Sequence, residues 1–83
     1  MKKKVLYIYG YGSSPESNTA TWLKENLPNS KVYSFKYDQR HPDESIPMLC
    51  SIAEELDIDV VIGSSLGGWY AMHVASICSL PSL

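Results

Sequence analysis

The segment Gly63-Ser64-Ser65-Leu66-Gly67 places a serine between two glycines at a spacing that suits nucleophilic chemistry. On a sharp turn between a strand and a helix, a serine exposes its hydroxyl, and the flanking glycines let the strand and the helix pass closely. Ser65 has glycine two residues before and two residues after it, whereas Ser64 has Ile62 and Leu66 at those positions. We therefore predict that Ser65 is the nucleophile and that Ser64 supplies a structural hydroxyl.

A nucleophilic serine also needs hydrogen-bond donors for the negative charge that develops on the substrate oxygen. A helix that begins after Ser65 offers free N–H groups and the positive end of its dipole there, so the Leu66 N–H is the first predicted donor. The loop after the first predicted strand, Gly10-Tyr11-Gly12, supplies the second. We predict the Tyr11 N–H, directly after Gly10, as this second oxyanion donor.

The chain has two histidines, and neither is predicted to serve Ser65 as a base. His73 follows on the same predicted helix, about 12 Å along the axis at the α-helical rise per residue, and is interpreted as a surface or packing residue. His41 and Asp38 lie in a polar loop that is interpreted as solvated, with a substitute base and acid as the alternative. Because a serine nucleophile needs a base and an acid that orients it, we hypothesise that the 83-residue chain is inactive alone.

Three strand and helix pairs are predicted to position these residues. Each predicted strand is short and rich in β-branched or aromatic residues, as in strands covered on both faces. The strands are expected at residues 5–9, 31–35 and 60–62, with Gly63 ending the third. The alternation predicts an α/β fold with a parallel sheet and right-handed crossovers.

The three helices are predicted from capping residues and from apolar residues at helical spacing. The first begins with Ser14 as its N-cap and Pro15 as its first residue, and it ends before Pro28. The second begins after Asp43, with Pro47 in its first turn. The third covers Leu66 to about Ile77. The apolar residues that share a face are Ala20, Leu23 and Leu27 in the first helix and Ile46, Leu49, Cys50, Ala53 and Leu56 in the second. The third helix carries Leu66, Trp69, Tyr70, His73 and Ile77 at helical intervals.

Composition places the chain among single globular domains and argues against several partners. Of its 83 residues, 45% are hydrophobic and 19% charged, and the formal net charge of -2 offers no basic face for nucleic acid. No apolar run approaches the roughly 18 residues that span a membrane, and the run after Lys4 ends at Gly10, too early for a signal peptide. Cys50 and Cys78 lack metal-ligand spacing, so we expect small core residues in a reducing cytoplasm.

The chain resembles the small bacterial YqiA-type esterases of the α/β-hydrolase superfamily over essentially all of its length. Their first loop, His-Gly-Phe-x-Ser-Ser-Pro, corresponds to Tyr9-Gly10-Tyr11-Gly12-Ser13-Ser14-Pro15, and their Gly-Ser-Ser-Leu-Gly-Gly turn with its aromatic residues corresponds to Gly63 to Tyr70. The resemblance implies a three-layer α/β-hydrolase sheet with its three strands in the order 2-1-3. It also implies hydrolysis of small carboxylic esters through an acyl-enzyme on Ser65, without a metal or cofactor.

Two departures from that family stand out. Tyr9 occupies the position of the family's histidine, which concerns how the loop is braced rather than the backbone donors. The family also continues for about as many residues again and carries its catalytic Asp and then its His there, whereas this chain ends at Leu80-Pro81-Ser82-Leu83. We interpret residues 1–83 as one partial domain without the triad base and acid, and residues 80–83 as the start of the next strand.

Two readings from other classes remain open. Gly10 and Gly12 follow a strand and precede Asp38, as in a dinucleotide-binding module, although Pro15 stands where that module needs a third glycine. Such a module predicts the strand order 3-2-1. The other alternative is a non-catalytic interaction fragment, because residues 60–62 would form an apolar sheet edge at which two copies could associate as a homo-oligomer.

Overall fold

The computed structural model describes residues 3–82 and contains three parallel strands that alternate with three helices. The elements are β1 (Lys3–Ile8), α1 (Asn18–Asn26), β2 (Ser30–Tyr33), α2 (Pro42–Glu55), β3 (Val60–Gly63) and α3 (Leu66–Cys78). The strand order is β2-β1-β3, with Val5 paired to Val32 on one side and to Val60 on the other. The α/β fold and the 2-1-3 order are confirmed, and the 3-2-1 order of a dinucleotide-binding module is absent from residues 3–82.

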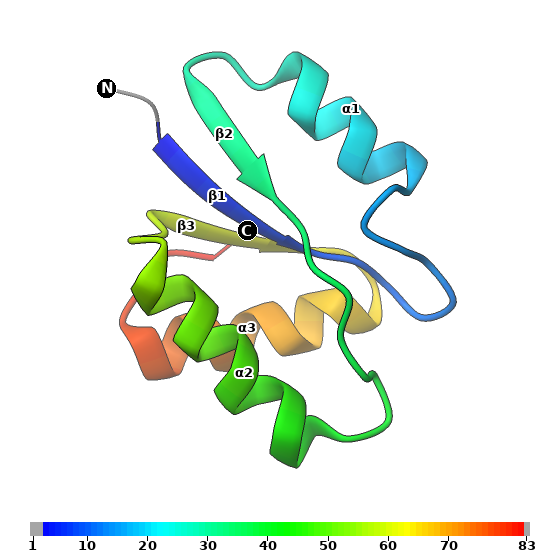
Figure 1. Ribbon diagram of the computed structural model, residues 1–83, viewed down its shortest axis with the longest axis vertical. Helices are drawn as coiled ribbons and strands as arrows, with labels where there is room; N and C mark the ends of the chain where they lie inside the picture. Colours follow the sequence, from blue (N-terminus) through cyan, green and yellow to red (C-terminus); the bar gives the residue numbers. More distant parts are fainter. Residues whose placement is uncertain (1–2, 83) are drawn as a thin grey trace.

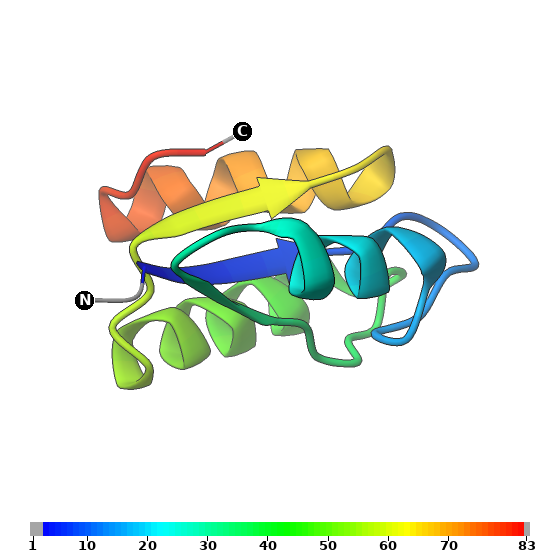
Figure 2. The same cartoon turned by 90° about the horizontal axis from the view of Figure 1, so that it is seen from above.

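The helices and the sheet form three layers (Figure 1). Helix α1 lies on one side of the sheet and contacts β2, while α2 and α3 pack against each other on the opposite side. Figure 2 shows β1 and β3 pointing toward the same edge of the sheet, where α3 begins. Ligands of open parallel sheets bind at this carboxyl edge, so the loops after β1, β2 and β3 form the region in which a site is expected.

The core is built around the central strand β1. Residues 5–9 are all buried, as predicted for a strand covered on both faces, and Leu6 has no exposed surface. The predicted apolar faces of α1 and α2 are confirmed: Ala20, Leu23, Leu49, Cys50 and Ala53 are buried. Leu27, Ile46 and Leu56 pack against them at the margin of the core.

Helix α3 buries a different stripe from the bulky face that the spacing predicted. Its buried residues are Gly67, Tyr70, Ala71, Val74 and Ala75, whereas Trp69 and Ile77 are 41% and 64% exposed. Gly67 lies against the backbone of β1, and a helix this close to the sheet leaves room beneath it mainly for small side chains. The prediction was therefore right about Tyr70 and about Leu66, which packs at the margin of the core, and wrong about Trp69 and Ile77.

Two helix starts differ from the predictions. Helix α1 begins at Asn18 rather than after Ser14, because the Ser17 hydroxyl accepts the Ala20 N–H at 3.2 Å and caps the helix there. Helix α2 begins at Pro42 rather than after Asp43, which places Pro47 in the helix interior instead of the first turn. Pro47 removes one helical N–H donor, but its side chain is exposed.

Strand β3 forms one edge of the sheet, and the end of the chain covers part of it. The Val61 N–H donates to the Pro81 carbonyl at 3.0 Å, and Val61 forms a parallel bridge with Ser82. Where the start of a further strand was predicted, the described residues contain one isolated bridge at Ser82, and Leu83 lies outside them. Association of two copies through residues 60–62 stays a prediction.

None of the helices within residues 3–82 is both long and apolar enough to cross a membrane.

Candidate functional site

The turn between β3 and α3 holds Ser65 in a conformation that serine rarely adopts. Ser65 precedes the first residue of α3 with φ 57° and ψ −126°, a strained region that is occupied mainly at functional sites. Its side chain caps no N–H of the helix, and the residue is exposed. Ser65 is therefore an exposed residue at the carboxyl edge of the sheet.

The glycines on either side of Ser65 are required by close backbone contacts. A Cβ on Gly63 would clash with the carbonyl group of Gly67, and a Cβ on Gly67 would clash with the carbonyl of Ile8. These contacts hold the start of α3 against both β3 and β1. The spacing that singled out Ser65 in the sequence thus corresponds to a turn in which neither glycine can carry a side chain.

Ser64 differs from Ser65 in its contacts. Its hydroxyl lies 2.7 Å from the Tyr7 hydroxyl, in a partly buried hydrogen bond between β1 and the turn. The Ser64 N–H also donates to the Ile8 carbonyl, at 3.3 Å. Ser64 therefore ties the turn to the central strand, the structural use predicted for its hydroxyl.

The loop after β1 approaches Ser65 from the other side. A Cβ placed on Gly10 would lie 3.0 Å from the Ser65 Cβ and 3.7 Å from its Oγ, so the Gly10 backbone borders the Ser65 side chain. Among the hydrogen bonds within residues 3–82, neither the Tyr11 N–H nor the Leu66 N–H has an acceptor. Tyr11 is 77% exposed.

Sequence reasoning missed the residue that holds this loop, Gln39. Its Nε2 donates to the Gly10 carbonyl at 2.6 Å, and its Oε1 accepts the Gly12 N–H at 3.3 Å. Gln39 lies in the loop after β2, far from Gly10 in the sequence. The only signal in the sequence was general: loops after neighbouring parallel strands meet at one edge of the sheet.

Buried tyrosines brace the same loop. The Tyr9 hydroxyl accepts the Tyr37 N–H at 3.2 Å, and the Tyr37 hydroxyl donates to the Tyr9 carbonyl at 2.7 Å. The Tyr70 ring packs edge-on against Tyr37, and its hydroxyl donates to the Gln39 carbonyl at 2.9 Å. Burial raises the pKa values of Tyr37 and Tyr70, so both phenols stay protonated as donors.

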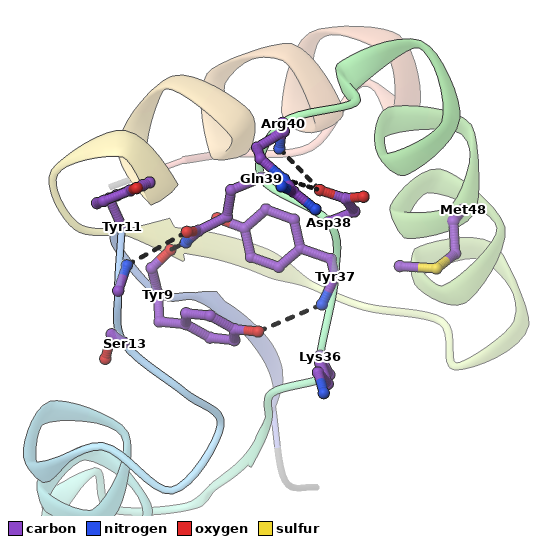
Figure 3. A pocket seen from close by; sticks show the side chains of 10 residues that line it. Tyr9, Tyr11, Ser13, Lys36, Tyr37, Asp38, Gln39, Arg40 and Met48 are labelled. Carbon is purple, nitrogen blue, oxygen red and sulfur yellow. Dashed lines mark hydrogen bonds and ion pairs between the residues drawn. The ribbon is translucent and has the colours of Figure 1, made fainter.

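An open cavity of about 750 Å³ lies on the outer side of this brace (Figure 3). Its walls are the loop after β1, the loop after β2 and one side chain of α2; the lining residues are Tyr9, Tyr11, Gly12, Ser13, Lys36, Tyr37, Asp38, Gln39, Arg40 and Met48. Ser65 does not line it. The Gly10-Tyr11-Gly12 loop therefore contacts Ser65 through Gly10 and the cavity through Tyr11 and Gly12.

The two histidines have other partners. The His73 ring packs on Trp69 with 4.3 Å between centroids, as expected for a packing residue. His41 Nδ1 lies 2.8 Å from Asp38 Oδ2, and this hydrogen bond raises the pKa of His41. Hydrogen bonds from the Arg40 N–H and His41 lower the pKa of Asp38. The His41–Asp38 pair is exposed at the start of α2, and within residues 3–82 neither histidine forms a hydrogen bond with Ser65.

Comparison with known proteins identifies a family that matches this chain. The family model described as "Uncharacterised protein family (UPF0227)" matches residues 4–83. A "UPF0227 protein" from Citrobacter koseri is 24% identical over an alignment of 82 residues, and the match covers 92% of this chain and 46% of that protein. The chain therefore spans less than half the length of this relative. No solved structure matches the chain. The chain belongs to the UPF0227 family.

Proposed function

We propose that this chain carries the nucleophile and the oxyanion donors of a serine hydrolase of the α/β-hydrolase superfamily that cleaves small carboxylic esters. The observation that carries the proposal is the geometry of Ser65: an exposed serine with φ 57° between two glycines that cannot bear a Cβ. A strained serine at the point where a strand ends and a helix begins is the arrangement of a nucleophile elbow.

In this mechanism, Ser65 Oγ attacks the ester carbonyl carbon and gives its proton to a base. The carbonyl oxygen becomes an oxyanion, which accepts hydrogen bonds from the N–H groups of Leu66 and Tyr11, neither of which has an acceptor within residues 3–82. Collapse of this intermediate expels the alcohol, which takes the proton from the base. Water then gives a proton to the same base and attacks the acyl-serine carbonyl; collapse releases the carboxylic acid, and the base returns the proton to Ser65 Oγ.

The base and the acid that orients it are proposed to come from sequence outside this chain. The chain covers 46% of its Citrobacter koseri relative, which leaves room in a protein of that length for both residues. We therefore expect the chain alone to hydrolyse a short-chain aryl ester no faster than its Ser65→Ala variant. If the chain alone does hydrolyse the ester, and both Ser65→Ala and His41→Gln abolish that activity, the base would instead be His41. Its 2.8 Å hydrogen bond to Asp38 would orient the imidazole.

A thiol at position 65 tests the elbow without any base. In a Ser65→Cys variant, the helix N-terminus and the two free N–H groups should stabilise a thiolate and lower its pKa by about one unit or more below the ordinary value near 8.5. The rate of iodoacetamide alkylation, followed against pH with the modified residue identified by mass spectrometry, gives this pKa. Cys50 reacts separately, because burial raises its pKa to about 11.

The matched control is Ser64→Cys, in which the thiol replaces a hydroxyl that is bonded to Tyr7. Its pKa should stay at or above the ordinary value. Equal thiol pKa values in the two variants would contradict the assignment of Ser65, because the turn would then provide no special stabilisation for a negative charge at that position.

A further inference from the structure

One amide side chain makes two hydrogen bonds to the loop that carries the Tyr11 N–H, in addition to the turn in which the Ser13 N–H donates to the Gly10 carbonyl at 3.1 Å. Gln39 donates from Nε2 to the Gly10 carbonyl at 2.6 Å and accepts the Gly12 N–H on Oε1 at 3.3 Å. The nitrogen of this amide thus holds the carbonyl of the residue before Tyr11, and its oxygen holds the N–H of the residue after Tyr11. Glutamine suits this task because its amide carries both a donor and an acceptor, and Figure 3 shows it lying between the loops after β1 and β2.

Gln39 is itself fixed to the helix that begins at Ser65. Its carbonyl accepts the Tyr70 hydroxyl at 2.9 Å, and Tyr70, in α3, is only 1% exposed. The Gln39 Nε2 also donates to the Tyr37 hydroxyl at 3.3 Å, and this hydroxyl in turn donates to the Tyr9 carbonyl. A chain of hydrogen bonds therefore connects α3, through Gln39, to the loop that borders Ser65.

We propose that Gln39 is a positioning residue that sets the orientation of the Tyr11 N–H toward the oxyanion formed at Ser65. This inference rests on the proposed function, because it assigns a purpose to a donor that the proposed reaction uses. The Tyr11 N–H is free of any acceptor in residues 3–82, while the groups on both sides of it are held by Gln39. A misplacement of about 1 Å at a reacting centre costs about a hundredfold in rate, so a clamp at this point has a direct consequence for catalysis.

The clamp is tested by NMR of the backbone amides in Gln39→Leu and Gln39→Glu. In Gln39→Leu, hydrogen exchange of the Gly12 amide should accelerate about five- to tenfold, the loss of one net hydrogen bond, and the Tyr11 amide should shift. In Gln39→Glu at neutral pH, the carboxylate still accepts from Gly12 but repels the Gly10 carbonyl, so the Tyr11 amide should shift as well.

Acidification separates a positioning role from a general loss of structure. Below a pH of about 4, the carboxyl of Gln39→Glu is protonated and can donate to the Gly10 carbonyl again, so the Tyr11 and Gly12 amides should return toward their positions in the unaltered chain. Gln39→Leu should show no such recovery. The matched control is Asn26→Asp, which replaces an amide that donates to the Trp22 carbonyl at 2.8 Å, away from this loop. This control should leave the Tyr11 and Gly12 amides unchanged at both pH values.

A second readout connects the clamp to Ser65. In the Ser65→Cys background, Gln39→Leu should raise the thiol pKa by about half a unit to one unit, because one of two thiolate donors is misplaced. A lowered thiol pKa that Gln39→Leu leaves unchanged overturns the positioning role and leaves the proposed function standing. An ordinary thiol pKa in Ser65→Cys overturns the proposed function, whatever the amides show. Unchanged Tyr11 and Gly12 amides in both Gln39 variants overturn the clamp itself.

Discussion

The turn at Ser65 and the loop at Tyr11 meet at the same edge of the sheet, but different forces hold them in place. The turn is fixed by backbone packed against backbone, since a Cβ on Gly63 or Gly67 would clash with main-chain atoms. The loop is fixed by side chains from another loop, chiefly Gln39. The packing of the turn should therefore be lost when a Cβ is added to Gly63 or Gly67, whereas substitutions in the loop should each remove individual hydrogen bonds.

The largest effect is expected on the side of the turn, from Gly67→Ala. The added Cβ would clash with the Ile8 carbonyl, and the strand and helix must separate to admit it. Overpacking of this kind costs about 3 kcal/mol, a large part of the stability of so short a chain. Urea unfolding followed by far-UV circular dichroism should give a much lower midpoint or no cooperative transition.

Gly68→Ala is the matched control for that prediction, since Gly68 is the next residue of the same helix. A Cβ there would lie 3.7 Å from its nearest neighbour, an ordinary contact, and alanine favours the helix by about 0.5 to 1 kcal/mol. The urea midpoint should therefore rise. Similar midpoints for the two variants would show that the close contact of α3 with β1 is not what fixes the turn.

A smaller effect is expected on the side of the loop, from Tyr37→Phe. The change removes the hydroxyl that donates to the Tyr9 carbonyl at 2.7 Å, within a buried group of aromatic rings. The hydroxyl also accepts from Gln39 Nε2 at 3.3 Å, so two hydrogen bonds are lost and the Tyr9 carbonyl keeps only a 3.5 Å contact to Gln39. The free energy of unfolding should therefore fall by about 1 to 2 kcal/mol.

Tyr33→Phe provides the comparison for Tyr37→Phe. The Tyr33 hydroxyl takes part in no side-chain hydrogen bond within residues 3–82, and the residue lies at the margin of the core. The free energy of unfolding of the Tyr33→Phe variant should differ from that of the unaltered chain by less than about 0.5 kcal/mol. Equal losses in both variants would mean that the Tyr37 hydroxyl contributes through packing alone and does not brace the loop.

The turn could be predicted from the sequence more fully than the loop, because the turn is held by its own backbone and the loop by side chains distant in the sequence. The turn was predictable because its determinants, two glycines and a serine, lie within five consecutive residues. The strand order was predictable because alternating strands and helices allow few right-handed arrangements, and the resemblance selected one of them. For the loop, the sequence indicated Gly10 and Tyr11 but gave no sign of Gln39, whose contact depends on how two distant loops meet.

The errors at helix starts and on α3 have local physical causes. Ser14 and Ser17 are equally good N-caps by residue type, and only the hydrogen bond from the Ala20 N–H to Ser17 decides between them. Helical spacing marked Trp69 and Ile77 as core candidates because it reads size and polarity. Helical spacing carries no information about the distance between α3 and the sheet, which the position of Gly67 against β1 determines.

Ser65→Gly sharpens the comparison on the side of the turn. Serine at φ 57° and ψ −126° is strained, and glycine adopts such angles without the clash of a Cβ. The strain relieved should exceed the cost of the greater freedom of glycine in the unfolded chain, so stability should rise by about 0.5 to 1 kcal/mol. Ser76→Gly, at an exposed site in the interior of the same helix, should lower it by about 0.5 kcal/mol. A loss of stability in Ser65→Gly would contradict the view that Ser65 stores strain at the turn.

The smallest effect is expected at the exposed pair His41 and Asp38, in the outer part of the loop after β2. Their 2.8 Å hydrogen bond raises the pKa of His41 and, with the Arg40 N–H, lowers that of Asp38. The His41 contribution to stability is complete below the ordinary histidine pKa and is lost as the pH rises through the raised value. The Asp38 contribution is complete above the ordinary aspartate pKa and is lost as the pH falls through the lowered one. The pair therefore stabilises the loop most between a pH of about 4 and about 6.5.

An NMR titration of the His41 ring measures this contact directly. The pKa of His41 should lie above the ordinary histidine value in the unaltered chain and fall back toward it in Asp38→Asn, whereas Asp57→Asn, at the opposite end of α2, should leave it raised. Because both groups are exposed, the urea midpoint should barely move in Asp38→Asn. A His41 pKa that Asp38→Asn leaves unchanged would remove the pair from the contacts that order this loop.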